Sequence, residues 1–207
     1  MDKPSYQTST DIADKFIRSL YNDSSFDSEP VGIESSGTST IFDKGFGLSP
    51  TIRNIDENYL NYKRLLDYQK QFSNKLIGYI MDGDFEYGIR SKADILVQEK
   101  IQENALATKS WLNHIFIEYF NDEQILMGIL RIVARLSYFQ IYPEGPTMAV
   151  AALSHKNDEI QECGIRAFES WETLESLNVL GSLKGNSEWL QEYIDKVVSG
   201  LRRKFDV

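Results

Sequence analysis

The feature that most constrains the fold is an apolar pattern that occurs three times in the C-terminal half of the chain. In each occurrence five residues stand at offsets 0, +4, +7, +8 and +11, which places them on one face of an α-helix. The sets are Ile125, Ile129, Ile132, Val133 and Leu136; Ile160, Gly164, Ala167, Phe168 and Trp171; and Leu190, Ile194, Val197, Val198 and Leu201. Their first members are 35 and then 30 residues apart, which predicts stacked helix pairs such as those of an α-solenoid.

Helical spacing extends over most of the chain from Asp56 onward, and no stretch alternates as a β-strand does. Polar pairs that can cap a helix precede the three sets: Asn121-Asp122, Asn157-Asp158 and Asn186-Ser187. The predicted helices are one from Asp56 to Asp82-Gly83, one over 95–119 with a break near Asn104 or Thr108, and others over 122–141, 148–153, 158–173 and 174–183. Pro143-Glu144-Gly145-Pro146 predicts a turn.

The N-terminal part has a different composition. Residues 8–21 have the spacing of a short amphipathic helix, and residues 22–50 are rich in Ser, Gly, Asp and Pro, which is typical of irregular structure. This second segment is either a connection packed on the helices or a functional loop.

The stretch from Met148 to Glu172 resembles a HEAT repeat. Ala152-Leu153 ends a first helix and Asn157-Asp158 makes the turn, as in that family. The second helix carries the valine-like, small and leucine-like residues of the family at Ile160, Gly164, Ala167 and Phe168. Gln161 departs from the arginine that is common there, so the charge ladder of long HEAT arrays is absent.

The resemblance implies HEAT-like helix pairs over about 121–205. The fold class expected is therefore all-α, either a HEAT-like α-solenoid or an irregular helical bundle, with an irregular N-terminal segment. We expect one domain, residues 1–207, in which 1–55 form the N-terminal helix and loop, 56–120 the long helices and 121–205 the helix pairs.

The charge of the chain favours basic partners. A net charge of −9 and a pI of about 4.8 oppose binding to nucleic acid or to anionic membranes. Cys163 is the single cysteine, and the N-terminus lacks the apolar core of a signal peptide. Arg131 and Arg135 interrupt the longest apolar segment. We therefore expect a soluble, cytoplasmic protein.

The sequence contains no catalytic signature, and it predicts no cofactor and no metal. His114 and His155 are far apart and outside any HExxH spacing, and Cys163 is expected to be an inert buried thiol. Residues 82–86 resemble a calcium loop, but an EF-hand starting at Asp82 would need Gly and Glu where Tyr87 and Ala93 stand. An acidic turn between helices is the simpler interpretation.

Carboxylates collect opposite the apolar face of the 158–172 segment. This acidic face comprises Asp158, Glu159, Glu162, Glu169, Glu172 and Glu175, and a second acidic group comprises Asp82, Asp84 and Glu86. Each group is either an ordinary solvated surface or a docking surface for a cationic protein.

We therefore expect a non-catalytic protein that binds another, basic protein. The most concrete hypothesis is an acidic immunity protein that neutralises a basic toxin such as a nuclease. The first alternative is a HEAT-like adaptor or assembly factor that binds a peptide or helix. The second is a helical enzyme whose site is assembled from scattered carboxylates.

Overall fold

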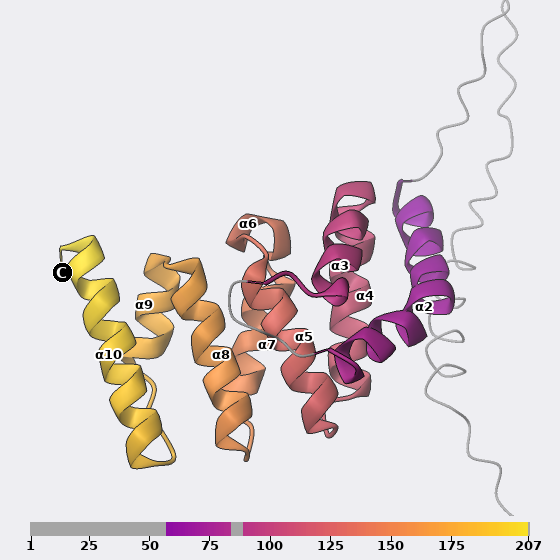
Figure 1. Ribbon diagram of the computed structural model, residues 1–207. Coiled ribbons are helices and arrows are strands. Elements are labelled where there is room, and N and C mark those ends of the chain that lie inside the picture. Colours follow the sequence, from indigo (N-terminus) through magenta and orange to yellow (C-terminus); the bar gives the residue numbers. More distant parts are fainter. Residues whose placement is uncertain (1–56, 84–88, 207) are drawn as a thin grey trace, which may run out of the picture. The chain divides into compact units, whose positions relative to one another are not determined.

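The computed structural model describes residues 57–83 and 89–206, which all belong to one compact unit. Helices are the only regular secondary structure in these two ranges, so the all-α prediction is confirmed for them (Figure 1). The predicted helix over 8–21, the irregular segment over 22–50, and Asp84 and Glu86 lie outside the described residues. In the part of the chain that is described, no helix is both long and apolar enough to cross a membrane.

The helices follow one another with short connections. They are α2 (Glu57–Met81), α3 (Lys92–Glu103), α4 (Ala105–Glu118), α5 (Glu123–Arg135), α6 (Tyr138–Ile141), α7 (Glu144–Leu153), α8 (Asp158–Trp171), α9 (Leu174–Gly181) and α10 (Glu188–Phe205). The predicted end of α2 and the positions of α7, α8 and α9 agree with this order within a few residues.

The predicted break in the 95–119 segment occurs at Asn104. Its side-chain oxygen accepts a hydrogen bond of 2.9 Å from the backbone N–H of Ala107, which caps α4. Its amide nitrogen donates a bond of 2.7 Å to the side-chain oxygen of Asn61 on α2. One residue therefore ends α3, begins α4 and ties both to α2.

The threefold apolar pattern forms the buried faces of α5, α8 and α10. Every residue of the three sets is buried. Asp122 accepts a bond of 3.1 Å from the N–H of Ile125, and Asn157 accepts one of 2.8 Å from the N–H of Glu159, so both cap their helices as expected. Ser187 holds the N-cap position of α10 without a side-chain bond.

Two local predictions differ from the structure. The 122–141 helix is interrupted after Arg135, because Leu136 is extended (φ −79°, ψ 148°) and α6 begins anew at Tyr138. The turn expected over 143–146 is shorter and lies one residue earlier, at Tyr142 and Pro143, because α7 begins at Glu144. Pro146 fits the first turn of this helix because backbone N–H groups there have no intrahelical acceptor.

The helices form two layers in the C-terminal half. In Figure 1, α5, α8 and α10 lie side by side, while α7 contacts α8, and α9 contacts α8 and α10. Gly164 permits the close approach of α7 and α8, since a Cβ at this position would lie 2.9 Å from the carbonyl oxygen of Ala149. This arrangement is compatible with an α-solenoid and with a helical bundle.

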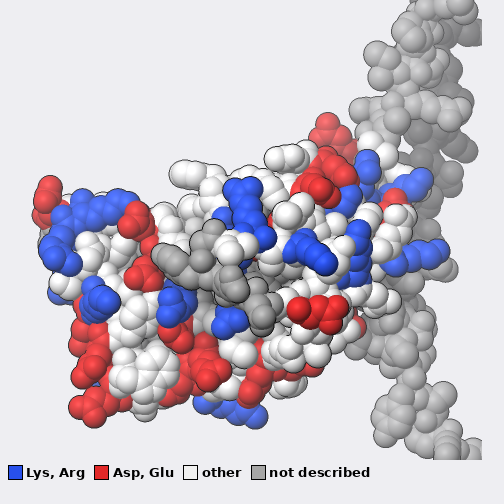
Figure 2. All heavy atoms as spheres, viewed as in Figure 1, with Lys and Arg blue, Asp and Glu red and all other residues white. Residues whose placement is uncertain are grey.

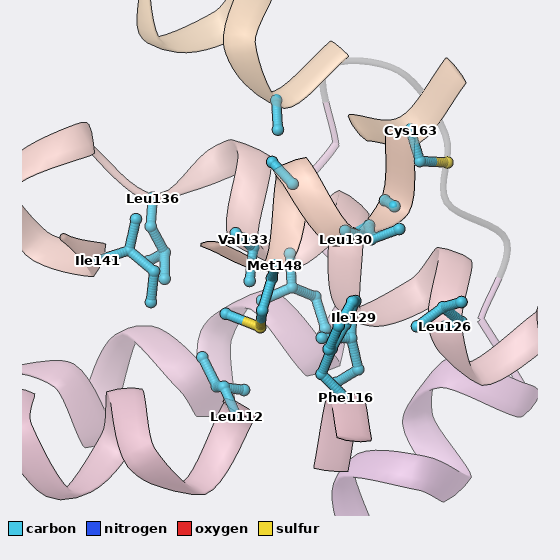
Figure 3. Packing of buried hydrophobic residues seen from close by; sticks show 14 of the residues in the cluster. Leu112, Phe116, Leu126, Ile129, Leu130, Val133, Leu136, Ile141, Met148 and Cys163 are labelled. Atoms are coloured by element: carbon cyan, nitrogen blue, oxygen red, sulfur yellow. The ribbon is translucent and has the colours of Figure 1, made fainter. Parts of the chain in front are cut away.

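The core runs continuously between the helices. Figure 3 shows Ile129, Leu130 and Val133 of α5 among Leu112 and Phe116 of α4 and Met148 of α7. Complete burial of this α5 face leaves its opposite side, with Arg131 and Arg135, available to line a groove.

Candidate protein-binding groove

A groove of about 1490 Å³ runs along α5. We name it the α5 groove. Helix α5 contacts both α3 and α8 and lies between them, so residues of α3 and of the segment before it line one side, and residues of α8 line the other. Tyr138 and Phe139 of α6 line it where α5 and α8 end. Several helices distant in sequence therefore build one concave surface.

Asp94 anchors the α3 side of the groove. Its side chain is 7% exposed, and its Oδ2 accepts bonds of 2.7 Å from the N–H of Ser91 and 2.9 Å from the Ser91 hydroxyl. Arg135 of α5 forms an ion pair with the same oxygen and donates a bond of 3.1 Å to the carbonyl of Ile89. Among the described residues, the buried Oδ1 of Asp94 has no hydrogen-bond partner.

The two sides of the groove carry opposite charges. Arg90, Arg131 and Arg135 line it from the α3 and α5 side, and Glu159, Glu162 and Glu169 line it from α8. Arg166 of α8 donates to Oε1 of Glu162 at 2.7 Å, so part of the α8 charge is neutralised. Figure 2 shows acidic side chains gathered where α8 and α10 begin, and basic side chains over α3.

The predicted acidic face is more strongly partnered than expected. Besides the Glu162–Arg166 pair, Glu169 accepts a bond from the Tyr193 hydroxyl, Glu172 forms an ion pair with Lys204, and Glu175 accepts a bond from the Tyr138 hydroxyl. Asp158 is partly exposed, and Glu159 is exposed. Other helices supply three of the four partners, although Glu169, Glu172 and Glu175 remain exposed to solvent.

Only part of the predicted site converges on the groove. Glu159, Glu162 and Glu169 line it, whereas Glu172 and Glu175 do not. Asp82 is exposed after the end of α2, and Asp84 and Glu86 lie outside the described residues.

Cys163 lines the groove but is only 5% exposed. Burial is the main cause that raises the pKa of its thiol, and the neighbouring Glu162 adds to this effect, while Arg131 opposes it. A raised thiol pKa lowers the fraction of reactive thiolate, which agrees with the expected inert role.

Each histidine interacts with a neighbouring residue of its own helix or turn. His114 is exposed, with its Nε2 3.7 Å from a carboxylate oxygen of Glu118. His155 is buried, and its Nδ1 accepts a bond of 3.1 Å from the N–H of Asn157 in the turn before α8. In the part of the chain that the structure describes, no three His, Cys, Asp or Glu side chains are grouped so as to hold a metal ion.

Two exposed apolar side chains at the groove were not anticipated. Phe139 is 89% exposed and Ile89 is 59% exposed, and both line the groove. The Tyr138 ring contacts Phe139 and Trp171 edge to face, with centroids 5.8 Å apart in each pair, which fixes the position of α6. The sequence does contain an indication, because Phe139 falls outside the repeated apolar offsets and so has no predicted place in the core. The prediction of one continuous helix over 122–141 hid this exposed position.

No protein-family model matches this chain. The comparisons with curated proteins and with solved structures likewise produced no match. The functional argument therefore depends on the groove itself.

Proposed function

We propose that this chain is a HEAT-like repeat protein that binds another protein in the α5 groove and catalyses no reaction. The observation that carries the proposal is the groove, which combines oppositely charged sides with the exposed apolar side chains of Ile89 and Phe139. Exposed aromatic side chains beside charged residues are typical of protein-binding surfaces.

The repeat interpretation is supported by three successive helix pairs, α4–α5, α7–α8 and α9–α10, whose second helices carry the same buried offsets. In such arrays the second helices present a continuous surface to a partner. Two of these second helices, α5 and α8, line the α5 groove.

Within this class, the most concrete version is an acidic immunity protein that neutralises a basic toxin such as a nuclease. The net charge of −9 supports it, because a cationic toxin is attracted over long range. An adaptor that binds a peptide or helix is the second candidate, and the lining of the groove along both α5 and α8 favours it.

Site-specific photo-crosslinking in the native host tests the proposal. A photo-reactive residue at Arg90 or at Ser170, both exposed groove positions, should crosslink the same protein. The control position is Ile117, which is 65% exposed and does not line the groove. Equal crosslinking from Ile117, or none from either groove position, would contradict the assignment.

The identity of the crosslinked protein separates the two versions. An immunity protein should restore growth when it is produced together with that partner, and the partner alone should be toxic. A partner that is harmless when produced alone favours an adaptor.

A further inference from the structure

A second pocket, of about 750 Å³, is lined by the end of α9, the residues that follow it and one side of α10. We name it the α10 pocket. It shares no lining residue with the α5 groove, so the two are separate sites. Its apolar lining residues are Leu180, Leu183, Ile194 and Val198.

Positive charge exceeds negative charge around the α10 pocket. The exposed side chains of Lys184, Arg202 and Arg203 line it, together with two carboxylates, Asp195 and Asp206. In the part of the chain that the structure describes, none of the three basic side chains forms an ion pair. Figure 2 shows basic side chains gathered where α10 ends. The pocket is therefore locally basic on a chain whose net charge is −9.

A chain of hydrogen bonds fixes the loop that carries Lys184. The N–H of Gly185 donates a bond of 2.9 Å to Oε1 of Gln191, and Nε2 of Gln191 donates one of 2.8 Å to a carboxylate oxygen of Asp195. Gly185 permits this close approach, since a Cβ there would lie 2.7 Å from the backbone nitrogen of Gln191. Lys184 is therefore held beside the first turn of α10.

The helix dipole explains only part of this basic group. The negative end of the dipole stabilises basic residues in the last turn of α10, where Arg202 and Arg203 lie. Lys184, by contrast, precedes α10 and lies near the positive end of the dipole, where a cation is disfavoured. A carboxylate bound beside Lys184 would offset that cost.

The basic residues are attached at two ends of the pocket. Arg202 follows Gln191 by eleven residues on α10, which corresponds to about 16 Å along the helix axis. Lys184 lies at the Gln191 end, so the pocket offers two positions for negative charge. A single small anion is much shorter than this separation, whereas an extended peptide spans it with about five residues.

We propose that the α10 pocket binds an extended acidic segment of a partner protein. One carboxylate of the segment pairs with Arg202 and Arg203, and a second, about five residues away, pairs with Lys184. An apolar side chain between them lies against Leu183 and Val198. The inference goes beyond the proposed function, because this segment and the occupant of the α5 groove are different ligands at separate sites.

The charge of the whole chain opposes such a ligand. A net charge of −9 repels an acidic peptide over long range. A protein of this charge that lacked a basic site should therefore deplete acidic peptides from a random library. Their enrichment would have to come from the local charge of a pocket.

Display of random linear peptides of about ten residues tests the inference on the full chain. Selection on the unaltered protein should enrich peptides with two carboxylates about five residues apart and an apolar residue between them. A synthetic peptide of the enriched sequence, labelled with fluorescein, then serves as the ligand in fluorescence anisotropy measurements.

Neutralising the two arginines should weaken binding of that peptide by at least about tenfold, because charge-assisted hydrogen bonds are lost. The variant is Arg202→Gln with Arg203→Gln. The matched control is Lys63→Gln with Lys70→Gln, at exposed positions of α2 outside both sites. In a repeated selection, Lys184→Gln should remove the preference for the second carboxylate only. Circular dichroism and the urea midpoint establish that each variant is folded.

Four results overturn the inference. They are no enrichment of acidic peptides, enrichment of carboxylates at one position only, equal weakening in the α2 control, and displacement of the peptide by an equal concentration of sodium glutarate. The last result would show that the pocket takes a free small carboxylate. Crosslinking from Arg90 and Ser170 tests the α5 groove separately, so the protein-binding function proposed for that groove stands or fails independently.

Discussion

The indole Nε1 of Trp171 donates a buried hydrogen bond of 3.1 Å to the backbone carbonyl of Leu136. These two residues are the last members of consecutive apolar sets, and they are 35 residues apart, like Ile125 and Ile160. In a continuous helix this carbonyl would accept the N–H of Gln140, which instead donates to Ser137 at 3.0 Å. The bond therefore joins α8 to the point where α5 ends.

Replacing Trp171 should strongly destabilise the fold. We expect Trp171→Ala to lower the free energy of unfolding by about 3–5 kcal/mol, because it removes a large buried side chain and leaves the Leu136 carbonyl unpaired. The control is Trp189→Ala on α10, where the side chain is 45% exposed and the expected loss is under about 1 kcal/mol. Equal urea midpoints for the two variants would show that Trp171 does not hold α5 and α8 together.

A pair of glycine variants tests the close packing of α7 on α8. Gly164→Ala should destabilise the protein by about 1–2 kcal/mol, because the overpacking penalty exceeds the helix preference of alanine. Its Cβ would lie 2.9 Å from the Ala149 carbonyl oxygen and 3.1 Å from a methyl carbon of Leu153. At Gly200 a Cβ meets nothing within 4 Å, so Gly200→Ala should stabilise α10 by about 0.5–1 kcal/mol. Thermal unfolding measures both, and stabilisation by Gly164→Ala would contradict the observed spacing.

The helices with buried apolar faces could be predicted because that information is local. Every residue of the three repeated sets is buried, and Asn104 breaks the long segment as its capping chemistry suggests. The interruption at Leu136 could not be read locally, since apolar spacing continues through Tyr138 and Ile141. Its stabilising partner, Trp171, comes from another helix.

The candidate site was predicted only in part for the same reason. The carboxylates from Asp158 to Glu175 are visible in the sequence. Their partners are not, because Tyr193, Lys204 and Tyr138, which bind Glu169, Glu172 and Glu175 respectively, belong to other helices. The arginines of the groove come from α5, from α8 and from the segment before α3. Their convergence is a property of helix packing, which a single sequence does not specify.

Two tyrosines should make the fold sensitive to alkaline pH. Burial is the main cause that raises the pKa of Tyr68 and of Tyr138 to about 12 each, assisted by Glu103 and Glu175 respectively. In the unfolded chain the pKa of tyrosine is about 10. Between about pH 10 and 12 these two phenols are therefore ionised in the unfolded chain and protonated in the folded one, so unfolding releases protons. The free energy of unfolding should therefore fall as pH rises through this window.

Urea titrations at pH 9, 10 and 11 measure this slope. The variants Tyr68→Phe and Tyr138→Phe should each reduce it, because phenylalanine cannot ionise in either state. An unchanged slope in both variants would show that these phenols ionise equally well in the folded protein. Absorbance at 295 nm gives an independent titration of the phenolate.

Cys163 should react slowly with thiol reagents in the folded protein. Burial raises the pKa of its thiol and restricts access, so the thiolate fraction near pH 8 is low. We expect alkylation by iodoacetamide to be at least about tenfold slower than in urea. Cys163→Ser should retain partner binding with only a modest loss of stability. A native reaction as fast as that of the unfolded chain, or loss of binding in a folded serine variant, would indicate a functional thiol.

The last prediction concerns the negative side of the groove. Reversing Glu159 and Glu169 to lysine should slow association with the crosslinked partner and flatten its dependence on salt, because two attracting charges become repelling ones. The fold should persist, since both side chains are exposed and the main loss is the Glu169–Tyr193 bond.

The matched control for this reversal is Glu99→Lys with Glu192→Lys, which makes the same change in net charge at exposed positions outside the groove. Association rates measured from low to physiological salt separate the two explanations. If the control slows association as much as the groove variant, the charge of the whole molecule governs encounter. If only the groove variant is slow, Glu159 and Glu169 act locally, as carboxylates that face basic side chains of the partner.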